Sequence, residues 1–258
     1  MRPRQIVLGA AGAVGVAAVI ETLSRTGLVD PAALPPATTI LREAGRLAVD
    51  GEFLVDVGAT LRAWLGGLAL AVLVAVPLGV LLGSVPLLGT AARVLVELMR
   101  PIPSVALIPL ALILFADPTR MKMSLIFYAC LWPILINTLY ALRDVDPLAK
   151  DSLRAFGFGT PAVLWRVSLP SAAPFIATGV RIAASVALIV VISTELYAGG
   201  VDGVGIYLSE TQSGGGRTDL LLAGACWAGV LGLLANAGLL GLQRVAFRWD
   251  SARAEAAA

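Results

Sequence analysis

Residues 151–170 read DSLRAFGFGTPAVLWRVSLP, a charged and regularly patterned stretch in a chain that is otherwise strongly apolar. Hydrophobic residues make up 58% of the 258 positions, charged residues only 14%, and the mean hydropathy is +0.89. This composition is more apolar than a soluble domain needs and is typical of an integral membrane protein. The quoted stretch is therefore expected outside the bilayer, between segments that lie within it.

The apolar segments around this stretch are interpreted as membrane spans. A helix needs about 20 apolar residues to cross a hydrocarbon core of about 30 Å, with every backbone group hydrogen-bonded inside the segment. The fold class that follows is all-α, a polytopic membrane protein with six transmembrane helices, at residues 5–20, 63–92, 99–116, 123–142, 180–196 and 220–243.

The third and the first of these segments are unusual. The third contains Pro101, Pro103 and Pro109, so we expect a broken helix, which is tolerated at membrane depth only against protein or a water-filled cavity. The first follows Arg2 and Arg4 in the manner of a signal peptide. Because no convincing cleavage site of small residues follows, we interpret it as a spanning helix.

Basic residues gather on one side of this topology, and the positive-inside rule assigns that side to the cytoplasm. Both termini and the quoted stretch then lie in the cytoplasm. The predicted organisation is residues 1–50, a first helix with an extracytoplasmic amphipathic segment; residues 51–250, a core of five spans with a loop at 143–170; and residues 251–258, a cytoplasmic tail. The basic residues on the cytoplasmic side are Arg2, Arg4, Arg143, Lys150, Arg154, Arg166, Arg244, Arg248 and Arg253.

Several functional classes are disfavoured by what the chain lacks. It has no histidine, and Cys130 and Cys226 lie in separate apolar segments, so neither a metal site nor a disulfide framework is expected. A net charge of +2 does not indicate nucleic acid as a partner. No GxxxxGK[ST] phosphate loop occurs, so this chain cannot supply an ATP site.

The loop at 143–170 is longer than a simple connection requires and should have structure of its own. Its apolar residues recur at roughly helical spacing around Gly157, Gly159 and Pro161, which predicts two short helices with a bend. A short amphipathic helix of this kind fits a groove on a partner protein, or it lies among lipid head groups. Periodicity alone does not choose between these alternatives.

The spacing within the stretch resembles the cytoplasmic signature of permease subunits of binding-protein-dependent ABC importers. That signature begins with an acidic residue and two small residues, which are followed by three variable residues and a Gly. Nine more variable residues then lead to an aliphatic residue, one further variable residue and a final Leu-Pro. Here the positions are filled by Asp151, Ser152, Leu153, Gly157, Val167, Leu169 and Pro170. Asp stands where Glu is usual, and Leu153 stands where Ala is usual.

The resemblance extends over roughly residues 35–248 and is closest to the nitrate, sulfonate and taurine branch. It is carried by LMRPIPSVALIPLALILFA at 98–116, WPILINT at 132–138, VDP at 145–147, Glu195 with GVG at 203–205, and LPPATTIL at 34–41. Each piece is weak by itself, and the combination is specific.

The resemblance implies a type I ABC importer permease with a cytoplasmic coupling helix, located in the bacterial cytoplasmic (inner) membrane. Two copies would form a homodimeric pore, two cytoplasmic ATPase subunits would use ATP and Mg, and an extracytoplasmic solute-binding protein would deliver the solute. This chain would bind no cofactor itself. The residues expected to couple it to the ATPase are Asp151, Ser152, Leu153, Arg154, Phe156, Gly157, Phe158, Gly159, Thr160 and Leu164.

Five residues within or beside the predicted spans are candidates for the translocation path: Arg100, Pro103, Ser104, Asn137 and Glu195. Glu195 lines the path or holds the fold through an internal partner, since ionisable groups in a span face protein or water. Arg100 attracts an anionic solute, pairs with an acid or reaches the cytoplasmic interface. The amide of Asn137 is expected to join helices.

Two other classes compete with an importer subunit. An ion-coupled secondary transporter predicts inverted repeats and several charges at the bilayer midplane, and a membrane-embedded enzyme needs a catalytic constellation. The sequence shows neither clearly. The branch resemblance implies a small solute, often anionic, such as a sulfonate, taurine, nitrate or bicarbonate, or else a small heterocycle.

Overall fold

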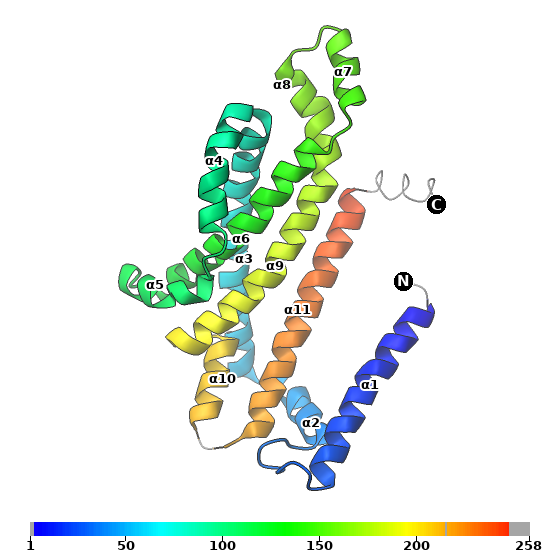
Figure 1. The fold of residues 1–258 in the computed structure, drawn as a ribbon. Helices are drawn as coiled ribbons and strands as arrows, with labels where there is room; N and C mark the ends of the chain where they lie inside the picture. The colour runs from blue at the N-terminus through cyan, green and yellow to red at the C-terminus, as the bar shows by residue number, and fades with distance from the viewer. Residues whose placement is uncertain (1–2, 215, 248–258) are drawn as a thin grey trace. The chain divides into compact units, whose positions relative to one another are not determined.

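The computed structural model describes residues 3–214 and 216–247, and the regular elements in that part of the chain are helical (Figure 1). The predicted tail at 251–258 and the arginines at 2, 248 and 253 lie outside the described residues. The helices are α1 (Pro3–Arg25), α2 (Ala37–Leu47), α3 (Gly51–Ser84), α4 (Pro86–Met99), α5 (Ile108–Leu114), α6 (Pro118–Arg143), α7 (Pro147–Ala155), α8 (Thr160–Val163), α9 (Leu169–Ala198), α10 (Val204–Ser213) and α11 (Thr218–Ala246).

Five helical segments in the described part of the chain are long and apolar enough to cross a membrane. They correspond to α1, α3, α6, α11 and the continuous helical run Thr160–Ala198 that ends with α9. A sixth span is obtained when α4 and the segment Ser104–Leu114, which are bent by 78°, are counted together. The all-α polytopic class is therefore confirmed.

The bent pair, here called the broken span, contains the break that the prolines predicted, but it begins at Pro86 and not at residue 99. α4 ends at Met99, and Pro103 adopts an extended conformation (φ −67°, ψ 123°) before a 3-10 turn, Ser104–Leu107, leads into α5. The hydroxyl of Tyr128 on α6 donates a 2.8 Å hydrogen bond to the carbonyl of Met99. The same carbonyl also accepts from the Ile102 N–H at 3.3 Å, so Tyr128 strengthens the hydrogen bonding of a backbone acceptor at the end of α4.

Several boundaries differ from the prediction; the fifth span, for example, begins earlier, since α9 starts at Leu169 and not at residue 180. The second span does not run from 63 to 92: α3 ends at Ser84, and Pro86 begins α4. The reason is steric, since Pro86 holds Val85 in an extended conformation (φ −115°, ψ 100°). The amphipathic segment predicted within residues 1–50 forms α2, which ends at Leu47, and the carboxylate of Asp50 accepts from the Phe53 N–H at the start of α3.

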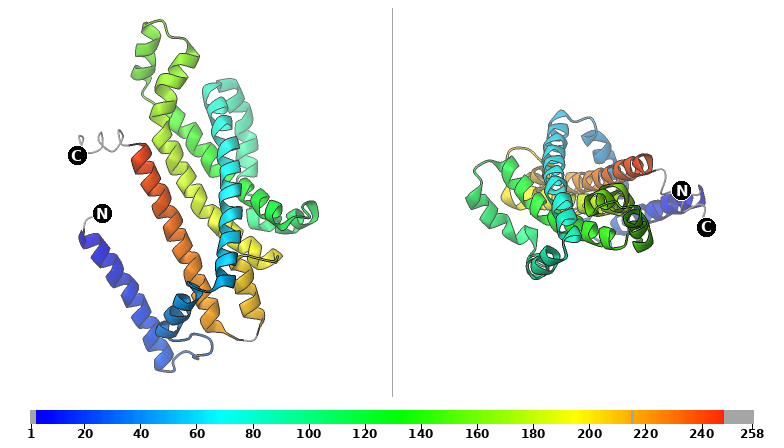
Figure 2. Two further views of the ribbon diagram at one scale, coloured as in Figure 1. Left: turned by 180° about the vertical axis from the view of Figure 1, so that it is seen from behind. Right: turned by 90° about the horizontal axis from the view of Figure 1, so that it is seen from above.

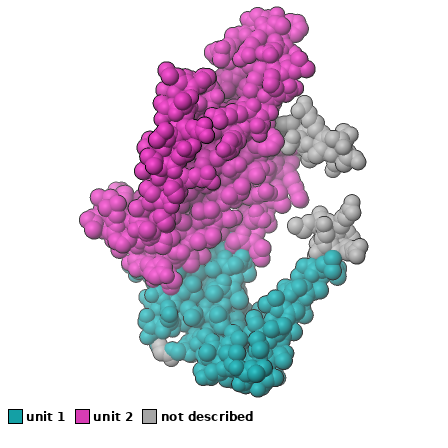
Figure 3. All heavy atoms as spheres, in the orientation of Figure 1, with its two compact units in different colours: residues 1–60, 199–231 teal, residues 61–198, 232–258 magenta. Residues whose placement is uncertain are grey.

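The chain forms two compact units, which are described separately (Figure 3). Unit 1 contains residues 1–60 and 199–231. Its apolar centre is Phe53, whose ring lies edge-to-face against Tyr207 at 5.0 Å and against Trp227 at 6.1 Å. The indole N–H of Trp227 donates to the Ala44 carbonyl at 2.8 Å and so ties α11 to α2.

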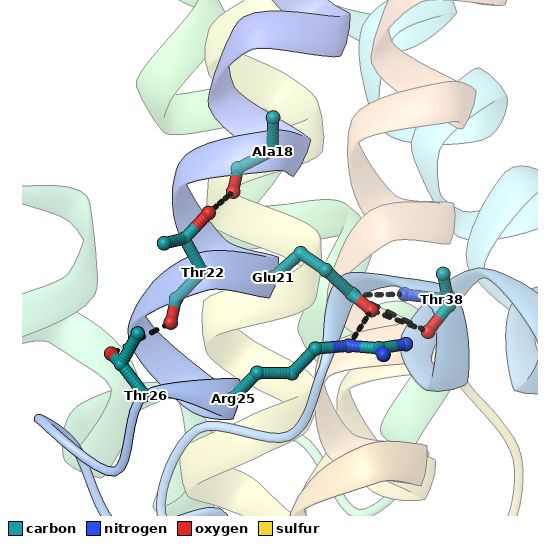
Figure 4. Close-up of polar contacts among 6 residues, drawn as sticks. All are labelled: Ala18, Glu21, Thr22, Arg25, Thr26 and Thr38. Atoms are coloured by element: carbon teal, nitrogen blue, oxygen red, sulfur yellow. Dashed lines mark hydrogen bonds and ion pairs between the residues drawn. The ribbon is translucent and has the colours of Figure 1, made fainter.

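Unit 1 also contains a cap between two helices (Figure 4). The carboxylate of Glu21 on α1 accepts hydrogen bonds from the backbone N–H (3.0 Å) and the hydroxyl of Thr38, in the first turn of α2. Arg25, one turn further along α1, donates to the same carboxylate at 2.6 Å. Because Pro36 precedes α2 and makes no side-chain cap, Glu21 supplies an acceptor from another helix.

Unit 2 contains residues 61–198 and 232–258, and its core lies among α3, α6 and α9. Small residues let these helices approach closely, as is common in membranes. A Cβ placed on Gly67 of α3 would lie 2.6 Å from the Ile126 Cβ of α6, and one on Gly79 would lie 2.7 Å from Thr138. The buried indole N–H of Trp64 donates to the Ala184 carbonyl of α9 at 2.9 Å.

Because α3 and α6 approach closely at Gly67, a larger residue at this position should lower the stability of the protein. Gly67→Ala should destabilise the solubilised protein by about 1–3 kcal/mol, because the new methyl group overlaps Ile126. Gly58→Ala on the same helix meets nothing within 4 Å and should be neutral or slightly stabilising. Thermal unfolding of both variants in detergent measures the difference. Equal midpoints would refute the close packing.

Candidate functional site

The segment 147–163 contains a short helix, α7, and a bend at Gly157, as predicted, but its second part, α8, continues into α9 and does not end as a second short helix. α7 and α8 stand together at the end of unit 2 where α6 ends and α9 begins (Figure 1 and Figure 2). Asp146 caps α7 by accepting from the Leu148 N–H at 2.9 Å, and Pro147 occupies the first turn. The ammonium group of Lys150 donates to the Leu142 carbonyl at 3.1 Å, which ties α7 to the end of α6.

Gly157 ends α7 through its backbone conformation. Its φ of +81° lies in the left-handed region that favours glycine. The N–H of Gly157 donates to the Arg154 carbonyl at 2.9 Å, and the N–H of Phe158 donates to the Leu153 carbonyl at 3.2 Å. This is the hydrogen-bond pattern of a Schellman motif. A Cβ at Gly157 would meet nothing within 4 Å, so the backbone angle is what requires glycine there.

The tip formed by α7, the bend and α8 carries large apolar side chains that are exposed to solvent. Phe156 is 82% exposed and Leu148 is 72% exposed. Trp165, in the π-helical turn Leu164–Ser168 after α8, is 69% exposed, and the Arg166 guanidinium lies 4.9 Å from the centre of the Phe158 ring. Exposed apolar surface with charges around it is a common feature of protein interaction sites.

The predicted coupling residues lie on this tip. Asp151, Ser152, Leu153 and Arg154 belong to α7, and Asp151 pairs with Arg154 at 3.0 Å. All are exposed except the half-buried Leu153 and Leu164, and the remaining members occupy the bend and the first turns after it: Phe156, Gly157, Phe158, Gly159, Thr160 and Leu164.

Three of the five predicted path residues line one cleft of about 380 Å³ in unit 2: Arg100, Ser104 and Asn137. The cleft lies beside the break between α4 and α5, and Tyr128 and Trp132 of α6 complete its polar lining. Pro103 and Glu195 are not among its lining residues; Pro103 lies in the break itself.

Asn137 joins helices by packing rather than by a hydrogen bond across them. Its amide donates to the Pro133 carbonyl of its own helix at 2.8 Å. A Cβ on Gly179 of α9 would lie 2.5 Å from the Asn137 Cβ, so the absent side chain makes room for this amide. The side chain thus borders the cleft while α9 packs behind it.

Glu195 lies away from the cleft in a buried ion pair. Its side chain is completely buried near the end of α9, and its carboxylate lies 2.9 Å from the ammonium nitrogen of Lys122 in the first turns of α6. The Lys122 side chain is only 6% exposed. This contact supports the structural alternative for Glu195.

Sequence reasoning missed Lys122 as the partner. The segment 116–122 reads as a polar turn, whereas α6 already begins at Pro118 and carries Lys122 into the core. The two residues are 73 positions apart, and no local rule relates them. The only available signal was that a charge in a span must be matched.

Unit 1 carries a further hollow, of about 620 Å³, that sequence reasoning did not identify. Its lining is mixed in charge with an excess of acids, and consists of Glu43, Arg46, Leu47, Asp50, Glu52, Phe53, Asp56, Tyr207, Glu210, Thr211, Arg217 and Leu220. The pKa of the Tyr207 phenol is raised, and the largest cause is the burial of its side chain.

The chain is similar to known proteins over the segments described above. The family model described as a binding-protein-dependent transport system inner membrane component matches residues 75–247. The chain is 30% identical over 253 residues to the taurine transport system permease protein TauC of Escherichia coli (strain K12), covering 95% of this chain and 90% of TauC. It is 28% identical over 182 residues to the nitrate import permease protein NrtB of Leptolyngbya laminosa, covering 70% and 64% of the two chains.

The fold is also similar to a solved structure. A chain in an inward-facing structure of the MetNI methionine ABC transporter matches with a TM-score of 0.65 and 17% sequence identity, covering 74% of this chain and 94% of that chain. At this level of identity the likeness concerns the fold. The family match at 75–247 contains the broken span, the cleft and the helix pair α7–α8.

Proposed function

Since the chain belongs to the family of binding-protein-dependent transport system inner membrane components, we propose that two copies of it form the solute pathway of an ATP-driven importer. Membership makes it a multi-pass inner-membrane permease component and not the ATPase. It also implies an ATPase and a binding protein as partners. The homodimer is our proposal, and residues 51–250 are its core.

The proposed orientation places both termini and the tip of α7 and α8 in the cytoplasm. This orientation follows from the positive-inside rule, because basic residues gather near both termini and in the loop at 143–170. The observation that carries the function is the exposed apolar tip held by the Gly157 bend, because a polytopic chain without an ATP site needs such a surface to be driven by a partner. Asp151, Arg154 and Phe156 are proposed contacts to the ATPase.

The pathway is proposed to pass the cleft beside the broken span. Arg100, Ser104 and Asn137 supply hydrogen-bond donors there, and none of the described residues that line the cleft is acidic. A small solute with an anionic group therefore fits it, such as taurine, nitrate or bicarbonate, or a related sulfonate. A small neutral heterocycle is the alternative solute. The solute-binding protein is proposed to dock on the extracytoplasmic side, where unit 1 presents its acid-rich hollow.

Reconstitution tests the proposed function. Proteoliposomes that contain the chain and its ATPase should accumulate the ligand of the partner binding protein, found by thermal shift, only with both ATP and the binding protein. Omission of either component should reduce uptake to the level of empty liposomes. Uptake by the chain alone, driven by an ion gradient, would identify a secondary transporter instead.

A further inference from the structure

α4 carries its charges on a single face. Arg93, Glu97 and Arg100 stand at positions i, i+4 and i+7, which lie above one another on a helix. Arg93 and Glu97 pair at 2.9 Å while their side chains remain 74% and 64% exposed. The opposite side of α4 is apolar, with Leu95 60% exposed. Charges in a spanning segment are costly against hydrocarbon and face protein or water.

This charged face borders a second hollow in unit 2, of about 160 Å³, between α3, α4 and α6. Tyr140 and Arg143 of α6 contribute to its wall, together with Arg93 and Glu97 of α4 and Arg100 at its C-terminal cap. Among the described residues that line it, three are arginines and one is acidic. The hollow is therefore electropositive.

The second hollow adjoins the cleft beside the broken span. Arg100 and Ile136 line both of them. The cleft lies at the break after α4, and the hollow extends from there along α4 and α6 toward Arg143, where α6 ends and the loop to α7 begins. A solute that leaves the cleft toward the α7–α8 end meets Arg93 and Arg143 next.

We propose that Arg93, Arg100 and Arg143 form an anion site on the cytoplasmic half of the translocation path. The guanidinium groups hold the anionic group of the solute by charge-assisted hydrogen bonds before release. Glu97 keeps Arg93 oriented and limits how tightly the anion is held. The inference rests on the proposed function and assigns specificity to Arg93 and Arg143. Of these two residues, sequence reasoning used Arg143 only as a topology signal and gave Arg93 no role.

Thiol chemistry tests this site without knowledge of the solute. The assembled complex in nanodiscs carries Arg93→Cys in a Cys226→Ser background, with Cys130 buried. It is treated with anionic sulfonatoethyl or cationic trimethylammonioethyl methanethiosulfonate. The ratio of anionic to cationic reaction rates should be at least about fivefold above that of free cysteine, since nearby unit charges interact by about 1 kcal/mol or more at this range.

Removal of the remaining arginines should reverse this preference. With Arg100→Gln and Arg143→Gln added, Glu97 dominates the site and the ratio should fall below that of free cysteine. Leu95→Cys, on the apolar face of α4, should react at least about tenfold more slowly. Thr90→Cys, one turn before Arg93 on the charged side, keeps all three arginines and repeats the test if Arg93→Cys does not assemble.

Three results would overturn the anion site. The first is a lack of labelling at both positions 90 and 93, and the second is a rate ratio that does not respond to the glutamine substitutions. The third is loss of anionic labelling when phosphatidylglycerol replaces phosphatidylcholine in the nanodisc, which assigns the arginines to a lipid head group. Because no solute transport is measured, these outcomes are separate from failure of the proposed function, which the uptake assay detects.

Discussion

Replacing Lys122 by Met should destabilise the protein by about 3–5 kcal/mol and remove most of the assembled complex from the membrane. The substitution leaves the carboxylate of Glu195 fully buried without the ammonium group that lies 2.9 Å away. Loss of the counter-charge of a buried carboxylate is more costly than the loss of one hydrogen bond between neutral groups. Fluorescence-detected size-exclusion chromatography with a heating series measures both effects.

Two controls separate the charge from the volume. Lys122→Met combined with Glu195→Leu removes both charges and should recover much of the stability, because apolar replacement of a buried pair is often tolerated. Arg120→Met breaks the exposed pair with Asp117, whose nitrogen and oxygen atoms are 3.8 Å apart, and should change stability by at most about 1 kcal/mol. A Lys122→Met variant as stable as Arg120→Met would show that the buried pair does not hold the fold.

The same residues separate the two roles considered for Glu195. If the pair is structural, Glu195→Gln lowers the amount of assembled complex together with uptake. Normal assembly with abolished uptake would instead place Glu195 on the path. Glu195 is buried against Lys122 and is not among the residues that line the cleft, which favours the first result.

Replacing Gly157 by Val should reduce ATP hydrolysis stimulated by the binding protein at least about tenfold, while the protein remains folded in the membrane. A β-branched residue is strained by about 1–2 kcal/mol or more at the φ of +81° found here. The strain opens the bend that positions Phe156 and Phe158. Co-purification with the ATPase and stimulated ATP hydrolysis give the measurement.

Two control variants, Gly157→Asn and Gly159→Ala, test whether the effect of Gly157→Val comes from backbone strain. Asn tolerates the left-handed region, so Gly157→Asn should retain most stimulation. Gly159 has a negative φ of −72°, and Gly159→Ala should be nearly neutral because the nearest atom to its new Cβ is 3.8 Å away. Full stimulation in Gly157→Val would show that the bend does not position the coupling surface.

The features that sequence reasoning predicted correctly depend on local rules. Proline has no N–H to donate within a helix, so Pro101 and Pro103 predicted the broken span independently of their surroundings. The bend after α7 was foreseen because Gly157 interrupts a helical pattern of apolar residues. Its left-handed angle and Schellman hydrogen bonds then supply the physical reason for that glycine.

The missed features depend on contacts between distant parts of the chain. Thr38 is capped by Glu21, 17 positions earlier, and Lys122 pairs with Glu195, 73 positions later. Periodicity contains no information about such partners. The charged face of α4 was visible as the spacing of Arg93, Glu97 and Arg100, but its relation to Arg143 required the packing of α4 against α6.

A photo-crosslinking amino acid at Phe156 tests most directly whether this chain is driven through the tip of α7 and α8. Phe156 is 82% exposed at the tip, so substitution there should not disturb the core. Irradiation of the intact complex should produce a crosslink to the ATPase subunit, and Gly157→Val should weaken it. Crosslinks to lipid alone, with an assembled and active ATPase present, would place the tip among the head groups and contradict the coupling role.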